Sequence, residues 1–138
     1  MKLKAYSQML TKLRSVESRM TRSFEEKTGF SLTRYEILTY LRDHGASAQA
    51  DLADHLDIDP AAVTRHLKIL EEKNYVNRKR NRENAREVIV SLTEYARSEL
   101  EKCRERHCEE TCELTVPFSK EEIDRLMHIL CRIEEKLP

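Results

Sequence analysis

The sequence contains few residues that break helices and no long apolar run. Its 138 residues include only two glycines and three prolines, and it has no tryptophan. Glycine and proline are the residues least compatible with a helix interior, so their scarcity favours a mostly helical protein. No apolar run approaches the roughly 18–20 residues that a membrane-spanning helix needs. The first residues also lack the layout of a signal peptide, so we expect a cytoplasmic protein with no membrane partner.

The chain also has no excess of charge of one sign. It carries 25 Lys and Arg against 25 Asp and Glu, a formal net charge of zero, which by itself argues against a non-specific nucleic-acid binder. The distribution is uneven, however. Between Lys73 and Arg86, six basic residues stand against the single acid Glu83, a local net charge of +5. Such a segment is typical of an edge that meets phosphate.

The motifs of common enzyme classes are missing as well. We find no Ser-His-Asp set, no glycine-rich phosphate loop and no pair of carboxylates that suggests a catalytic cleft. Two glycines are also few for a nucleotide site. The sequence therefore indicates a protein that is not an enzyme.

Apolar residues recur at intervals of three and four at both ends of the chain. This spacing predicts a long amphipathic helix over 3–27 that ends at Gly29, and a last helix that begins with a capping box at Ser119. The two stripes consist of Leu3, Tyr6, Leu10, Leu13, Met20 and Phe24, and of Ile123, Leu126, Met127, Leu130 and Ile133. These stripes are longer than a small helical core can bury, so we expect a second copy of the chain to cover them in a homodimer.

Start and stop signals predict three shorter helices in the middle of the chain. Capping residues, a proline at a first helical position and a closing glycine mark their limits. The helices run from the capping-box pair Thr33 and Glu36 to His44, from the cap Ser47 through Leu56, and from Asp59-Pro60 to about Lys73.

The periodicity changes after these helices. Residues 75–80 and 87–92 carry β-branched residues in alternation around the polar segment NRENAR, which predicts a β-hairpin with a basic tip. Thr93 then caps a further helix, whose apolar face is formed by Ala96, Leu100, Cys103, His107 and Leu114. The predicted fold class is mainly α with a small β-hairpin, in the order α-α-α-α-β-β-α-α.

Residues 49–72, QADLADHLDIDPAAVTRHLKILEE, have the pattern of a helix-turn-helix. A recognition helix needs small residues at its start, so that its backbone can enter the major groove, and polar or cationic side chains behind them. The hairpin that follows makes the motif a winged helix-turn-helix. The DNA-contacting residues expected here are Gln49, Ala61, Ala62, Thr64, Arg65, His66 and Lys68, with Arg82, Asn84 and Arg86 in the wing.

The segment LADHLDIDPAAVTRHLKILEEKNYVNRKRNRENAREVIVSLTEYA resembles the MarR family of regulators, above all in its VTR, YV and VSLTE runs. The resemblance covers nearly the whole chain. It implies an intertwined homodimer that binds pseudo-palindromic operators on double-stranded DNA, usually as a repressor. It also implies that Thr64, Arg65 and Lys68 contact the major groove and that Arg86 is the wing arginine. Asn84 stands where the family's wing aspartate is expected, so the usual wing ion pair cannot form.

The resemblance also implies a division of the single domain, residues 1–138. Residues 1–30 and 93–138 would form the dimerisation helices. Residues 31–92 would form the winged helix-turn-helix, with the helix-turn-helix at 49–72 and the wing at 75–92.

Cysteines and a histidine in the fifth helix are the candidate sensor residues. A helical residue advances about 100°, so Cys103 and His107 share one face while Cys108 and Cys112 share another, and one ion cannot collect all four. By resemblance to zinc-responsive MarR proteins, Glu36 would add a ligand to Cys103 and His107. Three interpretations stay open: packing residues with no cofactor required, a zinc site, or thiol redox sensing by Cys108 and Cys112.

The leading hypothesis is a DNA-binding repressor that is relieved by a small ligand, a metal or an oxidant. A first alternative is an ArsR-like metal-sensing repressor, for which the third helix offers only Asp51, Asp54 and His55 as ligands. A second alternative is a winged-helix module that binds a protein partner.

Overall fold

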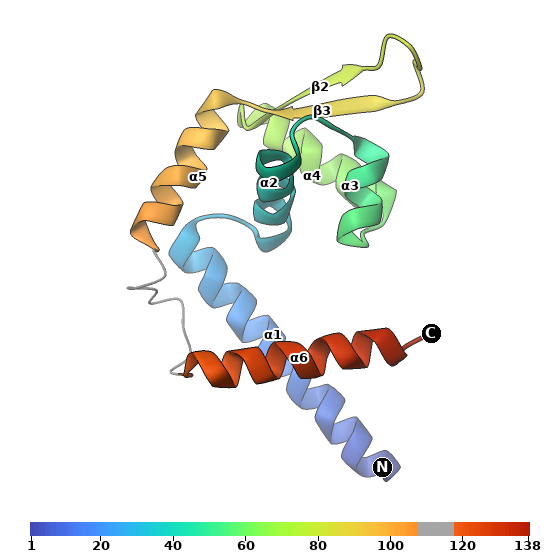
Figure 1. Ribbon diagram of the computed structural model, residues 1–138, viewed down its shortest axis with the longest axis vertical. Helices are drawn as coiled ribbons and strands as arrows, with labels where there is room; N and C mark the ends of the chain where they lie inside the picture. The colour runs from blue at the N-terminus through green and yellow to red at the C-terminus, as the bar shows by residue number, and fades with distance from the viewer. Residues whose placement is uncertain (108–117) are drawn as a thin grey trace.

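The computed structural model describes residues 1–107 and 118–138, and consists of helices and one small sheet that lies at one end of the molecule (Figure 1). The elements follow one another as α1 (Leu3–Thr28), α2 (Leu32–His44), β1 (Ser47–Ala48), α3 (Gln49–Leu56), α4 (Pro60–Glu72), β2 (Val76–Arg80), β3 (Val88–Leu92), α5 (Glu94–Arg106) and α6 (Lys120–Lys136). In Figure 1, α2, α3, α4 and the sheet form a compact lobe, and α1 extends away from it. The predicted mainly α fold with a β-hairpin is confirmed.

Several helix ends lie where their capping signals predict. Gly29 ends α1 in the left-handed conformation, with φ 75°. Thr93 accepts a hydrogen bond from the Ala96 backbone N–H, 3.0 Å away. The capping box of α6 is complete, because the Glu122 N–H donates to the Ser119 hydroxyl at 3.2 Å and the Ser119 N–H donates to the Glu122 carboxylate at 2.9 Å. These caps form because both partners lie within one turn of the chain.

The capping box predicted at Thr33 and Glu36 is wrong. The helix begins at Leu32, and Ser31 is its N-cap, although the Ser31 side chain accepts no capping hydrogen bond. The predicted cap at Ser47 is also wrong: Ala48 occupies the N-cap position of α3, and the Ser47 hydroxyl donates to the Gly45 carbonyl, 2.9 Å away.

Ser47 belongs instead to a strand that the predicted order lacks. The sheet has the order β1-β3-β2, and both pairs are antiparallel. Ser47 lies opposite Val90, while the hairpin pairs Val76 with Leu92 and Arg80 with Val88. The short β1 therefore anchors the start of α3 to the hairpin. The predicted fifth helix ends earlier than its stripe suggested, because His107 is the C-cap of α5; Leu114 lies outside the described residues.

The core lies between α2, α3, α4, α5 and the sheet. It includes three residues of α4 that form its inward face, Val63, Leu67 and Leu70, each at most 2% exposed. The other buried members are Ile37, Leu38, Leu41, Leu52, Ala53, Val76, Val90, Ala96 and Leu100. Burying such side chains contributes roughly 1.5–3 kcal/mol each, so this cluster holds the helix-turn-helix to the wing.

Aromatic rings connect the end of α1 to this lobe. Phe30 contacts Tyr35 and Tyr75, with ring centroids 5.8 and 5.9 Å apart, and Tyr75 stacks on Tyr95 at 5.4 Å. Burial raises the pKa of the Tyr75 hydroxyl, and the neighbouring Tyr95 and Glu99 add to the effect. The rings fix where the long helix leaves the lobe.

The apolar stripes of α1 and α6 are not covered by the described residues of the protomer. In α1, Leu10 is 46% exposed and Met20 is 45% exposed. No residue of α6 is buried, and Leu130 is 39% exposed. Among the described helices, none combines the length and the apolar character that crossing a membrane requires.

The two glycines should differ in their cost of replacement. Gly29 has φ 75° and ψ 2°, whereas Gly45 has φ 79° and ψ −168°, a region that essentially only glycine adopts. An added Cβ meets no atom within 4 Å at either position, so backbone strain alone decides the outcome. We expect Gly29→Ala to lower the free energy of unfolding by about 1 kcal/mol and Gly45→Ala by about 2–3 kcal/mol.

Urea denaturation at one fixed protein concentration measures both values. The variant Gly29→Asn is the control, because asparagine tolerates the left-handed conformation and should be milder than alanine. Equal costs for the two alanine variants would contradict this description of the turns.

Candidate nucleic-acid interface

A tight turn joins α3 to α4 and sets the angle between them. Asp57 ends α3 in the left-handed conformation, with φ 50° and ψ 49°. The Ile58 N–H donates to the Ala53 carbonyl at 3.0 Å, which closes the end of α3. Asp59 is the N-cap of α4 and Pro60 its first residue, although the Asp59 side chain makes no capping hydrogen bond.

The face of α4 opposite the core carries the residues expected to contact DNA. Four of them are exposed, namely Ala61, Thr64, Arg65 and Lys68, and Ala62 is half-buried. His66 departs from this pattern. It is half-buried, and its Nδ1 has no hydrogen-bond partner among the described residues. Burial lowers the pKa of His66, and the positive charges of Arg34 and Arg65 lower it further, so the neutral form of the ring is favoured. His66 is thus less exposed than a residue on the outer face of α4 was expected to be.

The wing is held to α4 by an ion pair. The Arg78 guanidinium contacts the Glu71 carboxylate at 3.1 Å with one nitrogen and at 3.4 Å with another. This hydrogen bond lowers the pKa of the Glu71 carboxyl, although burial works in the opposite direction. This pair could not be predicted from the sequence, because no local pattern indicates that a helix residue will contact a strand residue.

The tip of the wing is ordered by its own hydrogen bonds. The Asn81 N–H donates to the Glu87 carbonyl at 2.8 Å, and the Arg80 guanidinium donates to the Ala85 carbonyl at 2.8 Å. Asn84 accepts a hydrogen bond from the backbone N–H of Arg86, at 3.2 Å. Asn84 therefore positions the Arg86 backbone in place of an ion pair with its side chain.

Four cations on α4 and the wing tip remain without an acidic partner. They are Arg65, Lys68, Arg82 and Arg86, all exposed. In the part of the chain that the structure describes, the ion pairs join other residues and none includes these four. Their charges are thus available to an anionic ligand, in a protein whose formal net charge is zero.

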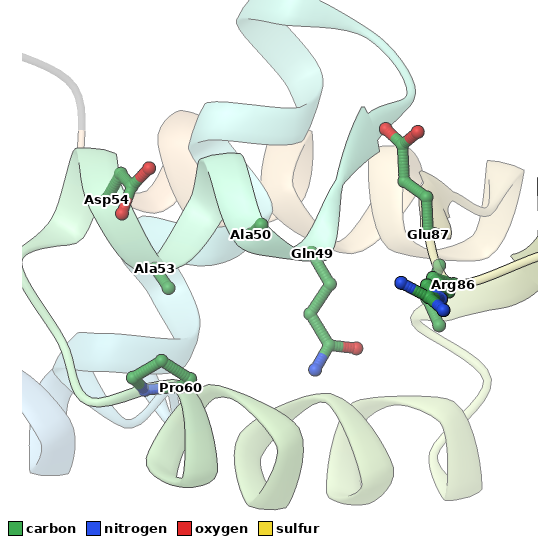
Figure 2. Close-up of a pocket in the computed structure, with 8 residues that line it drawn as sticks. Gln49, Ala50, Ala53, Asp54, Pro60, Arg86 and Glu87 are labelled. Atoms are coloured by element: carbon green, nitrogen blue, oxygen red, sulfur yellow. The ribbon is translucent and has the colours of Figure 1, made fainter. Parts of the chain in front are cut away.

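A pocket of about 270 Å³ lies between the two helices and the wing, and Figure 2 shows its lining. Gln49, at the start of α3, projects into the space between Pro60 of α4 and Arg86 of the wing. Its amide nitrogen donates to the Thr64 hydroxyl at 2.7 Å. The structure therefore brings Gln49, Thr64 and Arg86 to one surface, although they come from three elements.

The candidate metal ligands are not gathered into one site. Cys103 is buried on α5 and Glu36 is exposed on α2. The His107 Nε2 lies 3.2 Å from the Lys27 carbonyl, so this ring contacts the end of α1. Among the described residues, no three side chains of the His, Cys, Asp and Glu types form a group that could hold a metal ion. Cys108 and Cys112 lie outside the described residues.

Comparison with known proteins gives one consistent answer. A family model described as the MarR family matches residues 30–88. The uncharacterized HTH-type transcriptional regulator YdgJ of Bacillus subtilis (strain 168) is 35% identical over 131 residues, which cover 95% of this chain and 80% of that protein. These matches favour the MarR type over the ArsR type.

Two solved structures have the same fold, each with a TM-score of 0.83. Reduced AbfR bound to DNA is 22% identical, and the alignment covers 96% of this chain and 92% of AbfR. A mutant MarR from E. coli complexed with operator DNA is 24% identical, and the alignment covers all of both chains.

The Cys103 thiol should be slow to react. Burial raises its pKa, against a lowering effect of Arg106, so little reactive thiolate exists at pH 8. In the variant Cys108→Ser, Cys112→Ser, Cys131→Ser, we expect the native protein to react with a disulfide reagent about tenfold or more slowly than the same chain in urea. The reaction rate of the native protein should rise only at a pH above the ordinary pKa of a free cysteine thiol. Equal rates in the native and unfolded chain would contradict the burial of this thiol.

Proposed function

Because this chain belongs to the MarR family of transcriptional regulators, we propose that it binds operator DNA as a homodimer and represses transcription until an effector lowers its affinity. The effector would be a small molecule, a metal ion or an oxidant, with no cofactor required for binding itself. The observation that carries the proposal is a set of four exposed cations on α4 and the wing that have no acidic partner in the described part of the chain, namely Arg65, Lys68, Arg82 and Arg86.

In this proposal α4 enters the major groove. Its first turn carries the small residues Ala61 and Ala62, which allow a close approach, and Arg65 and Lys68 then reach base edges and phosphates. The wing tip places Arg82 and Arg86 along the backbone or in the minor groove, where the potential is most negative.

Gln49 and His66 have supporting roles in the proposed interface. Gln49, at the start of α3 and bonded to Thr64, would approach the DNA backbone. Asn84 accepts the hydrogen bond of the Arg86 N–H and so holds the main chain of the wing arginine. His66 is half-buried, so we propose a contact only at the margin of the groove.

The homodimer is supported by the uncovered stripes of α1 and α6. Leu10, Met20 and Leu130 are each about two-fifths exposed in the protomer, and a second copy would bury them. Residues 1–30 and 93–138 would form this dimerisation region, and 31–92 the DNA-binding lobe. Two-fold symmetry would then place the two α4 helices about 34–36 Å apart, one turn of DNA. A protein that acts on the chromosome would work in the cytoplasm.

Removing single cations should weaken operator binding and its dependence on salt. We expect Arg65→Gln and Arg86→Gln each to lower affinity about tenfold or more at moderate salt. If Arg86 contacts phosphate, its loss should also reduce the slope of log K against log[salt] by about 1 for each protomer. Fluorescence anisotropy with labelled duplex, over a series of salt concentrations, measures both quantities.

Arg97→Gln is the matched control, because this exposed arginine lies on α5 and faces Glu94 at 3.8 Å. Unchanged DNA binding by Arg65→Gln and Arg86→Gln would exclude the proposed interface and favour a protein partner.

A charge within the α6 stripe should separate the dimer. We expect Leu130→Glu to convert the protein to monomers and to abolish tight operator binding, because an uncompensated carboxylate would enter the apolar interface. Arg132→Glu changes charge on the opposite side of α6 and should leave the dimer intact. Sedimentation velocity on both variants is the measurement. A dimeric Leu130→Glu protein would show that the stripe is not the interface.

A further inference from the structure

The Thr64 hydroxyl makes two hydrogen bonds within the protein. Its oxygen lies 3.0 Å from the Pro60 carbonyl, four residues earlier in α4, and 2.7 Å from the Gln49 amide nitrogen. A carbonyl oxygen can only accept, so the single hydroxyl proton is donated to Pro60. The hydroxyl must then accept the hydrogen bond from Gln49.

This accounting limits what Thr64 can offer to DNA. The side chain is exposed, yet it has no proton left to donate to a base. One lone pair of the hydroxyl and the γ-methyl group remain. Ala61 lies three residues earlier on the same exposed side of α4, so its methyl group is a neighbour of the Thr64 methyl group.

In the major groove, thymine alone presents a methyl group, at C5, and the methyl groups of alanine and threonine are its usual apolar contacts. We infer that Ala61 and Thr64 read thymine through its 5-methyl group, and that Gln49 is a positioning residue that keeps the Thr64 hydroxyl turned away from the base. This inference rests on the proposed function, since it requires α4 to enter the major groove.

If the Thr64 hydroxyl contacted the base in place of the methyl group, the effects of serine and valine at this position would be reversed. If the hydroxyl left Pro60 and bound a base edge, serine could replace threonine and valine could not. If the methyl group is the reader, valine can replace threonine and serine cannot. The two substitutions therefore separate the two chemistries without removing any charge.

The experiment first selects an operator from random duplex DNA with the full-length wild-type protein. Each thymine of the selected sequence is then replaced by uracil, which differs only by lacking the methyl group. We expect at least one replacement in each half-site to weaken binding about fourfold, the effect of one buried methyl group. The variants are then compared by one quantity, the ratio of the affinity for thymine DNA to the affinity for uracil DNA.

Thr64→Val should keep this ratio, and Thr64→Ser should bring it close to 1. Gln49→Ala should also lower it, because the Thr64 side chain is then free to rotate. In the Thr64→Val background, Gln49→Ala should leave the ratio unchanged, since no hydroxyl remains to be positioned. Thr11→Ser and Gln8→Ala are matched controls on α1, where the Thr11 hydroxyl makes the same bond four residues back, 3.0 Å from the Ser7 carbonyl. Both should keep the wild-type ratio.

Different failures have different meanings. If the wild type enriches no sequence, the proposed function is wrong and the inference falls with it. If an operator is selected but uracil is tolerated at every position, or serine keeps the ratio and valine loses it, the methyl readout is overturned while the proposed function stands. If Gln49→Ala keeps the ratio, the positioning role of Gln49 is overturned.

Discussion

The packing of α4 against α2, α3 and the sheet is the contact on which the rest of the structure depends. Val63, Leu67 and Leu70 are buried among residues of α2, α3 and the sheet. Because a helix is rigid, burying this face determines which residues face outward, and these include Thr64, Arg65 and Lys68. The same packing brings the wing beside α4, where the ion pair between Arg78 and Glu71 fixes it.

The distribution of charge in this molecule matters more than its net charge. The chain is neutral overall, so its affinity for an anion must come from a few positions. Some basic residues elsewhere in the described part of the chain have an acidic partner, as Arg104 has Glu101 and Lys102 has Glu99. Arg65 and Lys68 on α4, and Arg82 and Arg86 at the wing tip, have no such partner among residues 1–107 and 118–138. A regulator built in this way would avoid the general attraction to DNA that an excess of positive charge produces.

Local features of the fold could be predicted from the sequence because their causes lie close together in the chain. Helix periodicity, the caps at Thr93 and Ser119 and the stop at Gly29 each depend on residues within one or two turns. The capping box predicted at Thr33 is wrong although its pattern was complete, because the N-cap of α2 is Ser31, two residues earlier. Strand β1 has only two residues, too few for an alternation to be visible, and it forms because β3 pairs with it.

The sequence by itself determined the fold class, the helix-turn-helix with its basic hairpin and the set of residues from which an interface could be built. The tertiary structure alone decided how those residues are used. It joined Gln49 to Thr64 and Glu71 to Arg78. It also left His66 half-buried, Glu36 exposed and Cys103 buried. The physical reason is that periodicity and capping act along one helix, whereas hydrogen bonds between elements depend on how the core packs them together.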